Sequence, residues 1–233
     1  MLIINEMFKS VQGEGNEAGK PTIFIRFTGC DFKCHFCDSK HTWSISREDE
    51  KLSPDQLFKK VETFGIKHVT LTGGNPAIHQ DEMKEFVKLL KENYYEISME
   101  TQGSIYRDWF SYIDNIVISP KNINNRPLED EEYQKIIQKI IDNKRNTLII
   151  KIPVFNEDDL RWIKEFVNFK GDYEIFLSVG NEHLDNEDIS EFREKILNKY
   201  EWLINKVLED KELSRCNVLP QIHTLVWGNK KGV

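Results

Sequence analysis

Three cysteines are crowded into the segment GCDFKCHFCDSK, residues 29–40. Cys30, Cys34 and Cys37 follow the spacing Cys-x3-Cys-x2-Cys. A loop of this length can bring three thiolates around one small inorganic centre, either a zinc ion or an iron-sulfur cluster. The spacing therefore indicates a metal centre, and the kind of metal depends on what completes the ligand set.

The number of ligands distinguishes the two kinds of centre. A structural zinc ion takes four ligands, and His35 or His41 would have to supply the fourth. An iron-sulfur cluster held by three thiolates leaves one iron open, which is useful only if another molecule binds that iron. The remaining cysteine, Cys216 in SRCNV, lies far along the chain and is interpreted as a structural residue.

Composition limits the class of protein. The chain has 233 residues, 39% of them hydrophobic and 30% charged, which is typical of a soluble globular protein with a substantial core. The 32 Lys and Arg against 39 Asp and Glu give a net charge of -7, which disfavours nucleic acid as a partner.

Neither a secretory signal nor a membrane span is expected. The N-terminal stretch MLIINEMFKSVQGEG lacks the apolar run of a signal peptide, and no segment approaches the ~20 apolar residues of a membrane helix. We therefore expect a cytoplasmic protein without a membrane partner. In that reducing compartment clustered cysteines favour a metal centre over disulfides.

Short strands alternate with helices along the chain, and these elements must position the cysteine loop. Runs of β-branched and aromatic residues predict strands at 21–29, 67–76 (running into a glycine turn), 95–103 (with a glycine end), 115–121, 147–155 and 173–179. Apolar residues at helical spacing predict helices at 54–64, 83–90, 133–141 and 157–168. The alternation implies right-handed βα units on a mostly parallel sheet.

The predicted fold class is α/β, a partial (open) βα barrel of about six parallel strands, because a full eight-unit barrel typically takes ~250 residues. We expect a single domain over residues 1–233, with a cysteine loop at 28–46 and a C-terminal segment, 217–233, closing the site. In such folds the chemistry lies at the carboxyl ends of the strands. Four glycine-marked or polar strand ends, GCDFKC, TGGNP, ETQG and SPK, should therefore share one face.

The cysteine spacing, with Phe36 directly before the third cysteine, resembles the signature of the radical S-adenosylmethionine (SAM) enzymes. In that family SAM chelates the open iron of a 4Fe-4S cluster, so the resemblance implies that the missing fourth ligand is the cofactor. The flanking motifs SVQGEG, FIRFTGC, CDSKHTW, TGGNP, ETQG, SPK and PQIHTLVWGNKKGV resemble, in this order, the 7-carboxy-7-deazaguanine synthase family.

The resemblance implies a lyase that converts 6-carboxy-5,6,7,8-tetrahydropterin to 7-carboxy-7-deazaguanine with loss of ammonia, on the route to queuosine and other 7-deazapurines in transfer RNA modification. SAM would be cleaved to a 5′-deoxyadenosyl radical that removes hydrogen from C6 of the substrate. The protein would orient and shield these reactants. The expected partners are the small pterin, a reduced flavodoxin or ferredoxin as electron donor, and a second copy of the chain in a homodimer.

The resemblance also assigns site residues. The cluster ligands would be Cys30, Cys34 and Cys37, and Ser39 would bind Mg2+. The cofactor-binding residues would be Phe36, Cys37, Asp38, Gly74, Asn75, Ser119, Pro120 and Lys121. The substrate-binding residues would be Val11, Gln12, Gly13, Glu14, Arg26, Thr72, His223 and Val233. No protein side chain is expected to act as a catalyst, since the radical comes from SAM.

Several of these residues have simpler interpretations from the sequence alone. Arg26 could clamp a substrate carboxylate with its planar fork or pair with a neighbouring acid. Ser39 could bind Mg2+ through its hydroxyl or cap a turn. Asn75 occupies a position where radical SAM enzymes usually have glutamate; its amide can accept a hydrogen bond from the SAM ammonium but lacks the charge.

Two rival functions are compatible with the cysteine loop. One is a different radical SAM enzyme, such as a glycyl-radical activase, which would need a groove for a partner protein. Arg26 and SVQGEG argue against it. The other is a zinc-binding interaction module without catalytic activity, which would be colourless and use four ligands.

Overall fold

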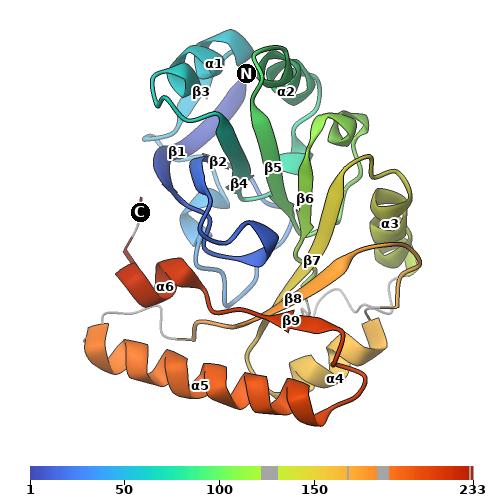
Figure 1. Ribbon diagram of the computed structural model, residues 1–233. Coiled ribbons are helices and arrows are strands. Elements are labelled where there is room, and N and C mark those ends of the chain that lie inside the picture. Colours follow the sequence, from blue (N-terminus) through green and yellow to red (C-terminus); the bar gives the residue numbers. More distant parts are fainter. Residues whose placement is uncertain (122–130, 167, 183–188, 231, 233) are drawn as a thin grey trace.

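The described strands form one twisted sheet (Figure 1). The computed structural model describes residues 1–121, 131–166, 168–182, 189–230 and 232. The strands are β1 (Leu2–Val11), β2 (Pro21–Phe27), β3 (Glu50–Leu52), β4 (His68–Gly73), β5 (Glu96–Thr101), β6 (Asn115–Ile118), β7 (Thr147–Val154), β8 (Glu174–Val179) and β9 (Cys216–Val218). Their order is β3-β1-β2-β4-β5-β6-β7-β8-β9, so the sheet ends at β3 and β9 and does not close.

The expected α/β fold with an open parallel sheet is confirmed. The six predicted strands are β2, β4, β5, β6, β7 and β8, and each is parallel to its neighbour in this series. The sequence reasoning missed three strands. β9 continues the parallel series, whereas β1 runs antiparallel to both β2 and β3 and widens the sheet on the other side.

The helices lie around the periphery of the sheet (Figure 1). They are α1 (Pro54–Glu62), α2 (Asp81–Glu92), α3 (Glu131–Asp142), α4 (Glu157–Phe166), α5 (Ile189–Glu209) and α6 (Ile222–Trp227), with 3-10 turns η1 (Gly15–Glu17), η2 (Lys40–Thr42), η3 (Pro76–Ile78) and η4 (Asp108–Tyr112). α1 to α4 were predicted, while α5 and α6 were not. No helix in the described part of the chain has the length and apolarity needed to cross a membrane.

Local sequence explains where the first helix begins. The Ser53 hydroxyl accepts a hydrogen bond from the Gln56 backbone, and the Gln56 side chain accepts one from the Ser53 backbone. This capping box satisfies two backbone donors at the start of α1, and Pro54 fills the first helical position, where no hydrogen bond to its nitrogen is needed.

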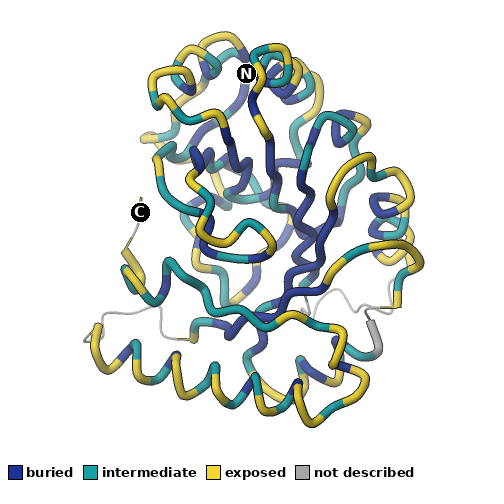
Figure 2. Tube along the Cα trace, viewed as in Figure 1, coloured by how far each residue is buried: buried dark blue, intermediate teal, exposed yellow. Residues whose placement is uncertain are grey.

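The side chains of β2 alternate between the apolar core and a cavity on the other face of the strand. Ile23, Ile25 and Phe27 are fully buried in the apolar core, whereas Phe24 and Arg26 lie on the opposite face and line a cavity. Successive side chains of a strand point to opposite faces, so one strand serves both environments. In Figure 2 the dark blue of buried residues runs along the central strands.

The parallel register brings the carboxyl ends of the strands to one level. Phe27 at the end of β2 pairs with Gly73 at the end of β4, and Thr101 at the end of β5 pairs with Ile118 at the end of β6. The segments that follow these strands, including the cysteine loop, therefore meet at one edge of the sheet, as the sequence predicted.

Candidate active site

A cavity of about 500 Å3 opens at this edge and contains most of the predicted site residues. The predicted residues that line it are Val11, Gln12, Gly13, Glu14, Arg26, Cys30, Cys34, Phe36, Cys37, Asp38, Ser39, Thr72, Gly74, Ser119, Lys121 and His223. Asn75 and Pro120 are not among the lining residues. Val233 lies outside the described residues, so its predicted contact with substrate stays a prediction.

The three cysteines of the loop are free thiols on the cavity wall. The Cys37 backbone donates to the Cys34 carbonyl, which closes a tight turn between these two residues. Among described residues, three other potential ligand atoms, from Glu17, His68 and Glu96, lie within 4.8 Å of each other. The three thiols on one loop supply the kind of ligand that an iron-sulfur cluster needs.

The Glu17, His68 and Glu96 group lies elsewhere, at the opposite ends of the strands. His68 and Glu96 are the first residues of β4 and β5. The Lys20 ammonium already lies between the two carboxylates, 2.8 Å from Glu17 and 2.6 Å from Glu96. This ion-pair network needs no metal ion.

The cavity does not itself favour thiolates. Burial raises the pKa of Cys30 to about 11, and the nearby Asp31 carboxylate adds to the rise. Burial also raises the pKa of Cys34 and of Cys37. Thiols in this environment become thiolates when a positively charged metal centre binds them.

Glycines in the TGGNP turn bring it into contact with the cysteine loop. The Gly74 backbone donates to the Phe27 carbonyl at 2.9 Å, and the Asn75 backbone donates to the Gly29 carbonyl at 2.7 Å. A Cβ atom at Gly74 would lie 1.9 Å from the Gly29 carbonyl oxygen. Only glycine permits this approach, so the turn after β4 fixes the start of the loop that carries Cys30.

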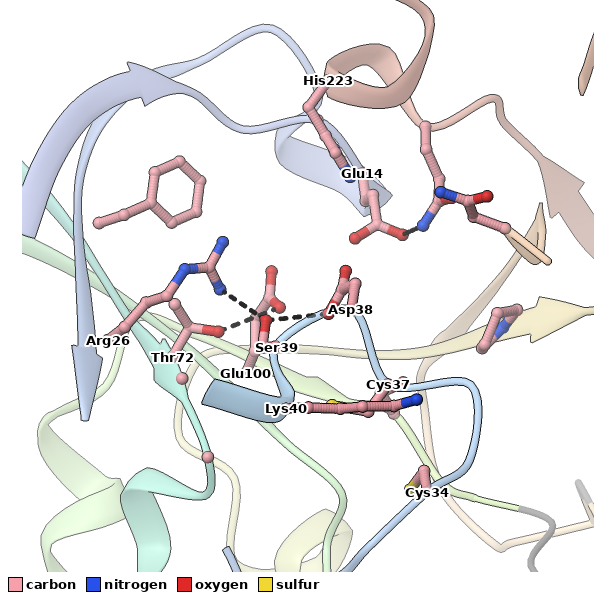
Figure 3. A pocket seen from close by; sticks show the side chains of 18 of the residues that line it. Glu14, Arg26, Cys34, Cys37, Asp38, Ser39, Lys40, Thr72, Glu100 and His223 are labelled. Atoms are coloured by element: carbon pink, nitrogen blue, oxygen red, sulfur yellow. Dashed lines mark hydrogen bonds between the residues drawn. The ribbon is translucent and has the colours of Figure 1, made fainter. Parts of the chain in front are cut away.

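Arg26 projects from β2 into the cavity beside the cysteine loop (Figure 3). Its Nε atom pairs with Glu6 at 2.9 Å, and Nη1 donates to the Ser39 hydroxyl at 3.4 Å. The ring of Phe8 lies 5.6 Å from the guanidinium carbon. Arg26 thus both pairs with an acid and faces the cavity. Glu6 orients the guanidinium through Nε, and the Nη atoms remain toward the cavity.

Ser39 is buried next to two other polar groups. Its hydroxyl donates to Asp38 at 2.9 Å while it accepts from Arg26. The hydroxyl and carboxylate together are hard oxygen donors of the kind that Mg2+ prefers. Ser39 makes no side-chain hydrogen bond to the backbone of η2, although it precedes that turn, so the interpretation as a turn cap is not supported.

A buried charge network forms another wall of the cavity, and its centre was not predicted. The Lys151 ammonium, on β7, lies 2.7 Å from Glu14 and 3.4 Å from Glu100. Gln221 donates to Glu14, and Gln12 donates to Glu100. The predicted residues Gln12 and Glu14 thus meet two residues, Lys151 and Glu100, that the sequence reasoning did not assign to the site.

The charges in this network hold each other ionised. Burial opposes ionisation of Glu14, but the charges of Lys151 and His223 outweigh it and lower the Glu14 pKa to about 2. Burial also opposes the charge on Lys151, and the carboxylates of Glu100 and Glu14 reverse this effect and raise the Lys151 pKa. The wall therefore presents two carboxylates and one ammonium to whatever enters the cavity.

The C-terminal segment packs directly on the loop after β1. The Ile222 backbone donates to the Gly13 carbonyl at 2.9 Å, and a Cβ atom on Gly13 would lie 2.3 Å from Nδ1 of His223. Gly13 is needed because the His223 ring occupies the space that a side chain would fill. In Figure 3 His223 and Glu14 approach the cavity from the same side.

Ser119 and Lys121 of the SPK segment after β6 line the same cavity as the thiols. Lys121 donates to the Ser119 hydroxyl at 2.7 Å. Burial lowers the Lys121 pKa, while the nearby Cys34 thiol opposes that shift. A lysine in this position supplies positive charge beside the cysteine loop.

Asn75 is fully buried, and its amide is already engaged. Its oxygen accepts from the Ala77 backbone and from Thr101, and its nitrogen donates to Asp31 and Ser104. These contacts give Asn75 a structural position behind the cavity wall, where it holds Asp31 in the cysteine loop. Its predicted contact with SAM stays a prediction.

The fold and the three-cysteine loop define the class of the protein: residues 24–167 match the model of the Radical SAM superfamily. The 7-carboxy-7-deazaguanine synthase of Bacillus subtilis is 37% identical over 96% of this chain and 95% of its own length. The corresponding enzyme of Bacillus cereus is 38% identical over 96% of this chain and 95% of its own length. The chain belongs to the 7-carboxy-7-deazaguanine synthase family.

A solved structure supports the fold. The crystal structure of QueE from Escherichia coli aligns with a TM-score of 0.71 and 23% identity, covering 95% of this chain and 94% of that one. The family assignment removes the two rival functions, a glycyl-radical activase and a zinc-binding module, that the cysteine loop alone left open.

Proposed function

We propose that this protein converts 6-carboxy-5,6,7,8-tetrahydropterin to 7-carboxy-7-deazaguanine with loss of ammonia. The observation that carries the proposal is one cavity in which the cysteine loop, the Arg26 guanidinium and the Glu14, Lys151 and Glu100 wall meet. The product is the compound named in the relatives. The activity would serve queuosine and related 7-deazapurine synthesis.

The cysteine loop fits a 4Fe-4S cluster with Cys30, Cys34 and Cys37 as ligands and SAM at the open iron. Bound there, this pair supplies the one-electron chemistry that removes a hydrogen atom from the substrate. The chain contributes a cavity at the edge of the sheet in which these groups meet. It also contributes glycine backbone at Gly74, polar groups at Asp38 and Ser119, and the charge of Lys121, for binding SAM.

Arg26 and the charged wall fit the two ends of the pterin. The planar Nη groups of Arg26 match a carboxylate, which they can hold with two parallel hydrogen bonds. Glu14 and Glu100 can accept hydrogen bonds from ring and amino N–H groups, and Lys151 can donate to a ring carbonyl or nitrogen. The substrate has a carboxylate at one end and such a donor and acceptor edge at the other.

A magnesium ion would lie beside Ser39. The hydroxyl of Ser39 and the carboxylate of Asp38 adjoin Arg26 and would hold the Mg2+ ion, whose charge would help to bind a substrate carboxylate. Mg2+ usually keeps several waters and few protein ligands, in keeping with this small donor set.

The remaining assignments concern partners and location. We infer a reduced flavodoxin or ferredoxin as electron donor, a homodimer and a cytoplasmic location, where the free cysteines of the loop stay reduced. We also infer a single domain in which residues 217–233 close the substrate cavity, because Gln221, His223 and Thr224 line it.

The test is an anaerobic reaction of the reconstituted protein with reductant, SAM, Mg2+ and the pterin, followed by mass spectrometry. We expect 7-carboxy-7-deazaguanine from the wild type and none from Cys34→Ala. Cys216→Ala, which removes the cysteine outside the cavity, should keep both iron content and product. Formation of 5′-deoxyadenosine without this product would refute the substrate; neither compound from a fully clustered protein would refute the whole proposal.

A further inference from the structure

Gln102 joins the end of β5 to the cysteine loop. It follows Thr101, the last residue of β5, and its side chain lies on the cavity wall with 5% of the residue exposed. Its Nε2 atom donates to the Asp31 carboxylate and approaches the Cys30 sulfur at 3.8 Å. One amide group thus contacts a predicted cluster ligand and the acid next to it.

The orientation of this amide is fixed by chemistry. An amide presents an oxygen at one end and an NH2 group at the other, and an ionised carboxylate can only accept. Asp31 therefore requires the NH2 end of Gln102, so the atom facing Cys30 is also a donor. The NH2 group has two hydrogens, which lets it serve both acceptors.

Asp31 and the backbone of Gln102 are both held in place. The Asp31 oxygen that Gln102 contacts also accepts from Asn75 at 2.9 Å. The backbone carbonyl of Gln102 accepts from the Tyr133 hydroxyl on α3, and the Tyr133 ring packs against Phe32 in the cysteine loop. The amide is consequently a rigid part of the wall.

The contact between Gln102 and Cys30 stabilises negative charge on the Cys30 sulfur. Cys30 also accepts from the Phe32 backbone at 3.4 Å, so Gln102 adds a side-chain donor to a sulfur that already has a main-chain donor. Donors to a cluster sulfur stabilise the reduced, more negative state and raise the reduction potential. A carboxylate near the sulfur has the opposite effect, and Gln102 offsets it by binding Asp31 as well.

We propose that Gln102 is a positioning residue for the iron-sulfur centre, which holds Asp31 and donates to Cys30 and thereby raises the reduction potential of the cluster. The proposal rests on the proposed function, because it requires the cluster at Cys30. Gln102 would affect how easily the cluster takes up an electron and would not affect binding of the pterin.

The test is an anaerobic redox titration of the reconstituted protein, followed by absorbance and electron paramagnetic resonance. Gln102→Met keeps the length of the side chain and removes both donors, so the midpoint potential should become more negative than in the wild type. Asp31→Asn removes the negative charge, so the potential should move in the opposite direction. Gln221→Met is the matched control, because this amide lines the same cavity but binds Glu14. Its midpoint potential should equal that of the wild type.

The two proposals fail differently. If the wild type forms no 4Fe-4S cluster, the proposed function fails. If the cluster forms with full iron and sulfide in Gln102→Met and titrates as in the wild type, the inference about Gln102 is wrong and the function stands. If Gln102→Met assembles poorly, Asp31→Asn decides: an unchanged or lower potential refutes the inference. A general loosening of the site would shift the midpoint potentials of both variants in the same direction. The proposed contact predicts a more negative potential in Gln102→Met and a less negative one in Asp31→Asn.

Discussion

Gly74 lies so close to Gly29 that a Cβ atom on Gly74 would be 1.9 Å from the Gly29 carbonyl oxygen and 3.2 Å from the Cys30 nitrogen. The turn after β4 and the start of the cysteine loop are therefore packed backbone against backbone. Neither can move without the other, which couples two motifs far apart in the sequence.

Gly74→Ala should displace the cysteine loop. The obstructing atoms belong to backbone, so the strain cannot be relieved by rotating a side chain, and we expect a loss of about 1–3 kcal/mol in the free energy of unfolding. Iron bound per chain after reconstitution should fall as well. Urea unfolding and iron analysis measure the two effects.

Gly65→Ala provides the contrast. Gly65 has φ of +70° with nothing within 4 Å of the added Cβ, so this variant should lose stability through backbone strain but keep its iron. Normal iron content in Gly74→Ala would show that the loop does not depend on this contact.

Lys151→Met should destabilise the protein strongly. It leaves Glu14 and Glu100, which are largely but not fully buried, without their cation, and breaking a buried ion pair costs at most about 3–5 kcal/mol. Lys135→Met removes the exposed partner of Glu131 and should change the free energy of unfolding by less than about 0.5 kcal/mol. Equal urea midpoints for the two variants would contradict the network.

Stability should fall in acid through Glu14. Its pKa is about 2 in the folded protein against 4.5 for the free side chain. Between these two pH values the folded state therefore binds fewer protons than the unfolded state. This contribution is fully present above pH 4.5 and is lost as the pH falls toward 2. Thermal melting at intervals between pH 7 and pH 3 measures it.

Glu14→Gln should flatten that pH dependence, because the variant has no carboxyl group to titrate at this position. The variant will be less stable than the wild type at neutral pH, since Lys151 loses one of its two partners. An unchanged slope below pH 4.5 would mean that other acids account for the acid sensitivity.

Arg26→Lys should weaken binding of the pterin more than it weakens the fold. Lysine keeps the charge but loses the planar fork that can hold a carboxylate with two hydrogen bonds. Hydrogen bonds to charged groups contribute about 1.5–3 kcal/mol, so KM should rise roughly ten- to hundredfold. Steady-state kinetics with varied pterin measure this rise, and exposed Lys9→Ala on the neighbouring strand should leave KM unchanged. An unaltered KM in Arg26→Lys would argue against a bidentate clamp.

The sheet was largely predictable because its central strands are rich in β-branched and aromatic residues. Short runs of this kind are typical of buried parallel strands, and β4 and β8 are indeed buried except at one terminal residue each. β1 escaped prediction because Glu6 and Lys9 interrupt its apolar residues. One face of β1 is toward the cavity, where Glu6 pairs with Arg26, whereas Lys9 is exposed outside the cavity.

The cavity wall was predictable only where motifs mark it. Lys151 belongs to no motif, yet a single lysine inside the apolar run TLIIKIPVF is a usable signal, because a charge on a buried strand needs partners. Asn75 could not be understood from its own neighbours in sequence. Its partners Asp31, Thr101 and Ser104 come from other segments and meet it only in the folded chain.

Glu14 and Gln221 are 207 positions apart along the chain and joined by a hydrogen bond in the cavity wall. During synthesis on the ribosome the cysteine loop emerges long before Gln221 does. A nascent chain can thus present its thiols while one wall of the cavity has not yet been made. Assembly of the site must wait for contacts of very long sequence separation, and such contacts form slowly. Prematurely terminated chains would expose reactive cysteines without a substrate cavity.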